Sequence, residues 1–261
     1  MNLSNLPARF KGRFQRTVSA LSFRRQFQMR NRTPFISFTF DDFPCSAFRA
    51  GGLILKKAGV RGTFYASLGL MGTEAPTGKI FLLNDLRDAA ADGHEIGCHT
   101  FAHCDSWKTA PATFEESIVQ NQRALAGAVS GAAFKTFSYP ISWPRPRTKR
   151  RVGRHFTCCR CGGQTFNSGI VDLNSLKAFF LEKSPDNIGP IKSLIDENRQ
   201  QRGWLIFATH DIAEQPTRYG CTPSFFEQVV AYSVTSGARI LPVIEAWQAI
   251  CDSARMPPQP V

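Results

Sequence analysis

The feature that most limits how this chain can fold is a repeated alternation of short apolar runs with longer amphipathic segments. From "FISFTF" at residues 35–40 onward, each run of β-branched and aromatic residues is followed by a segment with helical spacing. This change recurs about seven times, which favours a parallel sheet whose strands are joined by helices. A chain of 261 residues is long enough to close such a sheet. We therefore predict an α/β fold, a single parallel barrel over residues 34–252.

Two terminal segments lie outside this predicted barrel. Residues 1–33 hold eight lysines and arginines and no acidic residue. Apolar residues recur there at helical spacing, which predicts an amphipathic cationic helix: Phe10, Phe14, Val18 and Leu21. The apolar stripe either packs on the outside of the barrel or docks on a surface such as a membrane, and the composition also superficially fits a mitochondrial transit peptide. Residues 253–261 end in "PPQPV" and are predicted to be a disordered tail.

The positive charge is concentrated in two blocks. Residues 145–160 contain seven further cations and no acid. The positive charge of this block and of residues 1–33 together therefore exceeds the net charge of the whole chain, +12. The second block either binds an anionic part of a substrate or forms a solvated loop. Neither block has the ordered aromatic interleaving of a nucleic-acid surface, so we expect no nucleic-acid partner.

The eight cysteines and the N-terminus bear on the compartment. "TVSALSF" is too short and too polar for the core of a signal peptide, and no run of 18 apolar residues suggests a membrane span. We therefore expect free thiols and a cytoplasmic protein, with peripheral attachment to the inner face of the membrane as an extension of that expectation. Cys158, Cys159 and Cys161 crowd together without a CxxC pair, which favours a thiol-rich strand over a zinc knuckle.

The stretch "GHEIGCHTFAHCD" at residues 93–105 superficially resembles the HExxH helix of a zinc protease. His94 and His99 are five residues apart with Gly97 between them, so they cannot share one helical face around a metal. His99 and His103 are four residues apart and can share one helical face around a metal. We expect His94 to be a strand residue outside any site.

Four of the predicted strands end in polar residues that suit catalysis. They end in Asp41-Asp42, in His99-Thr100 with His103 one turn on, in Ser138-Tyr139-Pro140, and in His210-Asp211. Each is weak evidence alone, because such residues are common helix caps and loop surfaces. Strand ends of a parallel barrel meet on one face, however, so together they predict a site.

These same residues resemble the motifs of the polysaccharide deacetylases, the NodB-homology or carbohydrate esterase 4 family. The resemblance covers roughly residues 34–250. Its motifs correspond to "TFDD" (39–42), "HTFAH" (99–103), "FSYPIS" (137–142) and "ATHD" (208–211); the first two match in full and the others in part. The resemblance implies a distorted (β/α)7 barrel, which agrees with the alternation, here with a basic N-terminal helical extension.

The resemblance also implies a role for each residue. Asp42, His99 and His103 would hold a divalent metal, zinc in the first place, with cobalt, manganese or nickel as alternatives. Asp41 would be the general base that activates water, and His210 the general acid that protonates the leaving amine. Tyr139, Pro140 and Ile141 would contact the substrate, with the backbone N–H of Ile141 stabilising the oxyanion.

Three positions depart from the family pattern. Ser138 stands where the family has an arginine that pairs with the catalytic base, which predicts a raised pKa for Asp41 unless another cation, such as Arg145 or Arg160, replaces it from a loop. We find no counterpart between residues 155 and 190 of the Asp-Trp element that orients the catalytic histidine. Ala208 replaces a leucine that lines the acetyl pocket, which would enlarge that pocket.

We therefore predict a metal-dependent hydrolase that removes N-acetyl groups from an amino sugar. Its substrate would be a polysaccharide, an oligosaccharide or a lipid-linked precursor, and it would carry an anionic or lipid-linked part. Two alternatives stay open: a catalytically impaired barrel that binds glycans, motivated by the missing arginine, and an O-acetyl esterase, because the same attack on an acetyl carbonyl serves esters.

Overall fold

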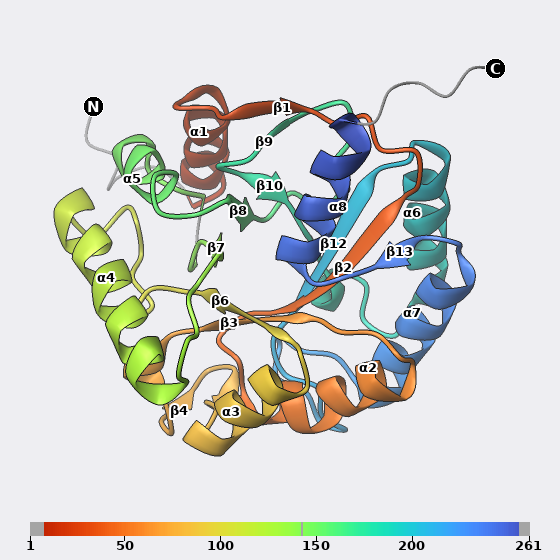
Figure 1. Ribbon diagram of the computed structural model, residues 1–261, viewed down its shortest axis with the longest axis horizontal. Coiled ribbons are helices and arrows are strands. Elements are labelled where there is room, and N and C mark those ends of the chain that lie inside the picture. Colours follow the sequence, from red (N-terminus) through yellow and green to blue (C-terminus); the bar gives the residue numbers. More distant parts are fainter. Residues whose placement is uncertain (1–7, 142, 256–261) are drawn as a thin grey trace.

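The computed structural model describes residues 8–141 and 143–255. Its main sheet is parallel throughout and follows the order β10-β8-β7-β6-β3-β2-β12-β11 (Figure 1). The strands are β2 (Phe35–Phe40), β3 (Thr63–Ala66), β6 (Glu95–Cys98), β7 (Thr136–Ser138), β8 (Cys158–Cys161), β10 (Leu176–Lys177), β11 (Phe179–Phe180) and β12 (Trp204–Thr209).

The two ends of this sheet are joined through one continuous segment. β10 pairs with β8 and β11 pairs with β12, and only Ala178 lies between β10 and β11. The N–H of Ala178 donates to the carbonyl of Cys161. Residues 176–180 therefore occupy a single strand position of the barrel, which we call a stave. The described residues form a nearly closed parallel barrel of seven staves. The predicted distorted (β/α)7 barrel is confirmed. β13 (Arg239–Ile240) adds a short parallel pairing at the start of β2.

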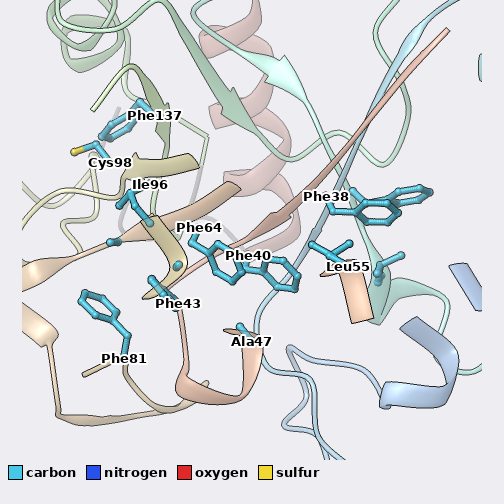
Figure 2. Close-up of a cluster of buried hydrophobic side chains, with 14 of the residues drawn as sticks. Phe38, Phe40, Phe43, Ala47, Leu55, Phe64, Phe81, Ile96, Cys98 and Phe137 are labelled. Carbon is cyan, nitrogen blue, oxygen red and sulfur yellow. The ribbon is translucent and has the colours of Figure 1, made fainter. Parts of the chain in front are cut away.

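Helices surround these staves and bury the larger apolar cluster (Figures 1 and 2). They are α2 (Leu53–Lys57), α3 (Leu83–Ala91), α4 (Pro111–Ala128), α5 (Pro146–Val152), α6 (Ile188–Gln200) and α7 (Pro223–Thr235). Phenylalanines form much of this cluster: the rings of Phe40 and Phe64 stack at 4.6 Å, and those of Phe43 and Phe81 at 4.7 Å. Their burial explains why so many phenylalanines occur within the short apolar runs.

A second apolar cluster joins alternate residues of the strands to α8 (Val243–Arg255). Phe35, Trp204 and Ile206 contribute from the strands, and Ile250 from α8. Because successive strand residues point to opposite faces, this cluster fills the barrel interior while the larger one faces the helices. α8 also continues beyond the boundary predicted at residue 252, and the last residues of the predicted tail lie outside the described part of the chain.

The N-terminal segment is folded against the barrel. α1 (Ala8–Leu21) is the helix predicted from the apolar stripe, and β1 (Gln26–Gln28) pairs antiparallel with β9 (Ile170–Asp172). The pairing of β1 and β9 was not predicted, because three residues give too short an alternation to detect. Of the segment predicted to extend over residues 1–33, the first seven residues lie outside the described chain.

The block at residues 145–160 is more regular than its composition suggests. It contains helix α5, which begins at a proline as helices often do. Cys158, Cys159 and Cys161 lie on or at the end of β8, so the prediction of a thiol-rich strand is confirmed. All eight cysteines are free, and burial raises the pKa of Cys159 and of Cys161 to about 12.

No helix among the described residues is long and apolar enough to cross a membrane.

His94 lies just before β6 and belongs to the packing of the barrel. Its ring meets Phe64 edge-on at 5.1 Å, and its Nδ1 accepts the backbone N–H of Gly62 at 3.0 Å. The side chain is outside the site described below, as predicted. Burial, which disfavours the imidazolium, lowers the pKa of His94 from 6.5 to about 4.

This lowered pKa predicts an acid-sensitive contribution to stability. Because the unfolded chain binds a proton near pH 6.5 and the folded chain only near pH 4, stability should fall as the pH drops through that window. His94→Asn keeps an acceptor for Gly62, so its free energy of unfolding should fall less on acidification than the wild type's, by up to about 3 kcal/mol. Urea unfolding on both sides of the window measures this difference. Equal losses in both proteins would contradict the assignment.

Candidate functional site

Two neighbouring strands bring Asp41, Asp42 and His210 together. β2 and β12 pair in register, with Phe40 opposite Thr209, so Asp41 and His210 follow side by side. The N–H of Asp41 donates to the carbonyl of Thr209 at 2.9 Å and continues the ladder by one residue. Asp42 then turns into the left-handed region with φ of 60°, a conformation that strains a non-glycine residue and is common at functional sites. The predicted meeting of strand ends therefore occurs.

His99 and His103 converge on the carboxylate of Asp42. Oδ1 of Asp42 lies 3.1 Å from Nε2 of His103 and 3.5 Å from Nε2 of His99. His99 follows the end of β6, where its N–H donates to the carbonyl of Ala66. One ligand atom from each of the three residues lies within 4.8 Å of the others, and no other such group occurs in the described ranges. The structure thus brings together all three residues predicted to hold a metal.

The contacts around this cluster fit a bound cation. Nδ1 of His99 is 2.8 Å from the carbonyl of Ser138, which can only accept, so Nδ1 carries the proton and Nε2 presents a lone pair. That lone pair faces Oδ1 of Asp42, a buried oxygen 3.5 Å away. Thr77 donates to the other oxygen, Oδ2, at 3.0 Å. Two electron pairs directed at each other in a buried space are stabilised by a shared cation, and an oxygen with two imidazole nitrogens suits zinc and related metals.

The protonation states of the cluster agree with ligation. Burial opposes the charged form of Asp42, but its hydrogen bond to His103 and the charges of the histidines outweigh burial and lower its pKa. Burial dominates for His99 and lowers its pKa to about 4. At neutral pH the cluster therefore offers a carboxylate and at least one neutral imidazole, the forms that bind metals.

Asp41 forms a buried ion pair with Arg160. The guanidinium Nη2 of Arg160 donates to Oδ1 of Asp41, and the side chains are 1% and 5% exposed. Burial disfavours the carboxylate, yet the charge of Arg160 holds the pKa of Asp41 below its ordinary value. The raised pKa that we predicted for Asp41 without a replacement cation therefore does not occur. Of the two cations that we considered as replacements, Arg160 fills the role, and it comes from β8 and not from a loop.

The register of the sheet explains how Arg160 can stand in for a residue at position 138. Ser138 of β7 and Arg160 of β8 are direct partners, so their side chains enter the barrel at the same level from adjacent staves. The guanidinium lies 4.9 Å from the centre of the Tyr65 ring and 5.6 Å from that of Phe180. The Tyr65 ring in turn lies against Gly97, where an added Cβ would come within 2.4 Å of it. Gly97 therefore makes the space in which Tyr65 supports Arg160.

His210 is oriented by a backbone carbonyl and by an aromatic ring. Its Nδ1 lies 3.1 Å from the carbonyl of Tyr219, so Nδ1 donates and Nε2 remains available. The ring of Phe180 stacks on the imidazole at 6.2 Å with an interplanar angle of 26°. These contacts take the place of the Asp-Trp element that the sequence lacks.

The loop that supplies Tyr219 is held by the residue after His210. Asp211 accepts from the N–H of Thr217 at 2.7 Å and from its hydroxyl at 2.6 Å. Gly220 packs so closely on Asp211 that a Cβ there would come within 2.3 Å of the Asp211 carbonyl oxygen. Asp211 is thus a structural part of the motif "ATHD", because it fixes the carbonyl that orients His210.

All five residues that were predicted to bind the metal or to transfer protons line one cavity of about 580 Å³. Tyr139 and Ile141, predicted to contact substrate, also line it, whereas Pro140 is buried and does not. The Tyr139 ring packs on Phe137 at 5.0 Å, and its hydroxyl is buried. Tyr139 therefore forms part of the cavity wall and offers no polar group to a substrate. Ile141 is 68% exposed with φ of 66°. Ala208 belongs to the interior cluster and does not line the cavity, so it does not enlarge it directly.

Further residues of the cavity were not anticipated. Thr77 comes from the loop between β4 (Glu74–Ala75) and β5 (Gly78–Lys79), a hairpin too short to predict. Glu182 lines the cavity with one carboxyl oxygen buried and unpartnered, and burial raises its pKa. Trp143 forms part of the rim. Of these residues, only Glu182 had a signal in the sequence, because it lies two residues after the strand β11 (Phe179–Phe180).

Comparisons with known proteins agree with this geometry. Residues 28–155 match the family model described as polysaccharide deacetylase. A curated relative, a gellan lyase from a Bacillus species, is 24% identical over an alignment 160 residues long that covers 54% of this chain. The match spans only 6% of that protein's length.

Three solved structures share the fold. A peptidoglycan N-acetylglucosamine deacetylase is 18% identical with a TM-score of 0.59, and the match covers 85% of this chain and 92% of that one. A mutant of the peptidoglycan deacetylase PdaC from Bacillus subtilis is 15% identical with a TM-score of 0.55, over 85% and 94% of the two chains. A family 4 acetyl xylan esterase from Clostridium thermocellum, in complex with cobalt, is 19% identical with a TM-score of 0.55, over 82% and 90%.

The geometry predicts that each chain binds one divalent cation. Equilibrium dialysis against zinc or cobalt, followed by elemental analysis, should show one ion per chain. Asp42→Asn and His103→Gln remove two of the three converging ligand atoms and should each weaken binding more than roughly 100-fold. Asp88→Asn and His155→Gln change a carboxylate and an imidazole outside the cluster and should leave binding unchanged. Stoichiometric binding that survives Asp42→Asn would place the metal elsewhere.

Proposed function

This chain belongs to the polysaccharide deacetylase family, and on that premise we propose that it removes N-acetyl groups from an amino sugar of a glycan. The observation that carries the proposal is the buried pair of Asp41 and Arg160 beside the cluster of Asp42, His99 and His103. The departure at Ser138 suggested a damaged catalytic centre. Arg160 supplies the cation that Ser138 lacks, so the argument for an inactive barrel loses its main support.

Asp42, His99 and His103 would hold the metal. A divalent cation bound there supplies Lewis acidity, which polarises an acetyl carbonyl and makes water more acidic. The chain contributes the orientation of the ligands: the Ser138 carbonyl fixes the tautomer of His99, and Thr77 fixes the carboxylate plane of Asp42.

Asp41 would accept the proton of the attacking water. A base that is already ionised at neutral pH can act without a preceding deprotonation, and Arg160 favours that ionised state. The same ion pair also fixes the direction of the carboxylate. Its second oxygen, Oδ2, is the one left to face the cavity, since Oδ1 accepts from Arg160.

His210 would deliver a proton to the leaving group. An amide nitrogen leaves only when it is protonated, so removal of an N-acetyl group requires an acid on the side opposite the base. The Nδ1–H of His210 is committed to Tyr219, which leaves Nε2 as the atom that exchanges a proton with the substrate. Glu182, which lines the same cavity, is suited to accept an N–H of the amino sugar or to neutralise the ammonium product.

We propose a glycan or glycan precursor as the substrate because the cavity has an open rim carrying Trp143 and Ile141, surfaces on which sugar rings can pack. An anionic part of the substrate has less support than the composition suggested. Among the seven cations at residues 145–160, only Arg160 lines the cavity, and Lys149 and Arg151 are paired with Asp172 and Glu115. The block therefore gives no specific support for an anionic substrate, and it is not a solvated loop either, because it contains α5 and the buried Lys149.

The proposal is tested by release of acetate. With added zinc or cobalt, the wild-type protein should release acetate from N-acetylglucosamine oligomers, and Asp41→Asn should lower kcat by roughly a thousandfold because it removes the base. Asp88→Asn is the control. Faster release from O-acetylated xylan than from the oligomers would favour the alternative of an O-acetyl esterase. Binding of oligomers without any release would establish the alternative of a glycan-binding barrel.

A second test isolates the role of Arg160 as a positioning residue. Arg160→Lys keeps a cation near Asp41 and should retain part of kcat, whereas Arg160→Met has similar length without charge and should lose roughly 100-fold. KM should change little in either variant, because substrate does not need the guanidinium to bind. In Ser138→Arg/Arg160→Ser the cation returns to the adjacent stave, and activity should exceed that of Arg160→Ser alone. Equal activity of the Lys and Met variants would remove Arg160 from the account.

A further inference from the structure

Helix α1 packs on the barrel with its polar side inward. Gln15 and Ser19 are buried at 9% and 0% exposure, whereas Phe10, Phe14 and Leu21 are exposed at 62%, 41% and 75%. A helix on a globular domain normally buries its apolar stripe. Of the two alternatives for this stripe, packing on the barrel applies to the half-buried Val18 and to the contact of Phe14 with Trp107, whereas Phe10 and Leu21 face outward.

Specific contacts hold the helix in this orientation. Lys149 is fully buried, and its Nζ donates to the carbonyl of Ser19 at 2.7 Å while pairing with Asp172 at 2.6 Å. Arg25, just after the helix, donates to the carbonyls of Phe156 and Thr157. A buried lysine placed at the last turn of a helix satisfies carbonyls that have no partner within the helix. The outward direction of the apolar stripe is thus fixed by buried polar bonds.

Cations border the exposed apolar stripe. Lys11, Arg13 and Arg16 lie on the same helix, and Arg24 follows it. The guanidinium of Arg150, from α5, lies 5.5 Å from the ring centre of Phe23, which is itself 45% exposed. Aromatic and aliphatic side chains surrounded by cations, without an acid among residues 1–33, match a surface that is both apolar and negatively charged.

We propose that the exposed face of α1, defined by Phe10, Phe14, Leu21 and Phe23 with its flanking cations, docks on the surface of a membrane containing anionic lipids. The apolar side chains enter the interface between headgroups and acyl chains, and the cations bind the headgroups. Charge complementarity favours this partner over a second copy of the chain, because two such faces would bring their cations together.

The docking face is connected to the cavity. Phe14 contacts Trp107 with ring centres 6.3 Å apart, and the indole N–H of Trp107 donates to the carbonyl of Trp143, which lines the cavity. The exposed Ile141 lies on the same rim. A membrane beneath α1 therefore lies beside the cavity mouth, which suits a glycan carried on a lipid. This last step rests on the proposed function, whereas the docking itself does not.

Vesicle sedimentation of the full chain tests the docking. The protein should sediment with vesicles of equal parts phosphatidylglycerol and phosphatidylcholine, and much less with phosphatidylcholine alone. Phe10→Ser/Leu21→Ser and Arg13→Gln/Arg16→Gln should each weaken sedimentation by roughly tenfold or more. Leu53→Ser/Val234→Ser and Lys57→Gln/Arg123→Gln alter exposed side chains elsewhere and serve as matched controls without effect.

Three results would overturn the docking proposal: no sedimentation with anionic vesicles, undiminished sedimentation of the α1 variants, or a dimer in solution that Phe10→Ser/Leu21→Ser converts to monomer. Acetate release from soluble N-acetylglucosamine oligomers separates this proposal from the proposed function. The α1 variants should release acetate at the wild-type rate even where they no longer bind vesicles. A wild-type protein that binds vesicles yet releases no acetate would refute only the function.

Discussion

The buried pair of Asp41 and Arg160 is the interaction on which the rest of the site depends. A carboxylate that is 5% exposed is costly to ionise, and the guanidinium that reaches it inside the barrel makes the largest contribution to keeping it ionised. Much of the interior serves that contact: Tyr65 and Phe180 cover the two sides of Arg160, and Gly97 leaves room for Tyr65. Phe180 also stacks on His210, so one ring contacts both His210, the proposed acid, and the cation paired with Asp41, the proposed base. Disturbing this pair should therefore affect both ends of the reaction.

The parallel sheet explains why the cation that pairs with Asp41 can come from either of two adjacent strands. Side chains of adjacent staves at the same register point enter the barrel at the same level, and Ser138 and Arg160 are such partners. The short side chain at 138 leaves the space that a longer one would fill, and its carbonyl still binds His99. The site requires a cation beside Asp41. Whether position 138 of β7 or position 160 of β8 supplies that cation matters less.

The sequence predicted best those features that depend on strand ends. Asp41, Asp42, His99 and His210 each follow an apolar run, with His103 four residues after His99, and parallel strands bring such residues to one face. Arg160 and Thr77 were harder because their contacts depend on strand register and on a short hairpin, neither of which has a periodic signal. The stripe on α1 was predicted, but the sequence left open whether it packs inward or faces outward, since a buried lysine 130 positions away fixes the helix. The cytoplasmic location stays a prediction.

The proposed deacetylase function depends on which atoms hold the cation. The described residues offer one candidate group, an aspartate with two histidines, while three buried cysteines on β8 offer a sulfur-rich alternative that the geometry does not assemble. X-ray absorption at the metal edge of the zinc- or cobalt-loaded protein distinguishes them directly. Ligation by Asp42, His99 and His103 predicts a shell of oxygen and nitrogen atoms with the scattering pattern of two imidazoles and no sulfur. A sulfur shell, or a spectrum unchanged in Asp42→Asn, would contradict it.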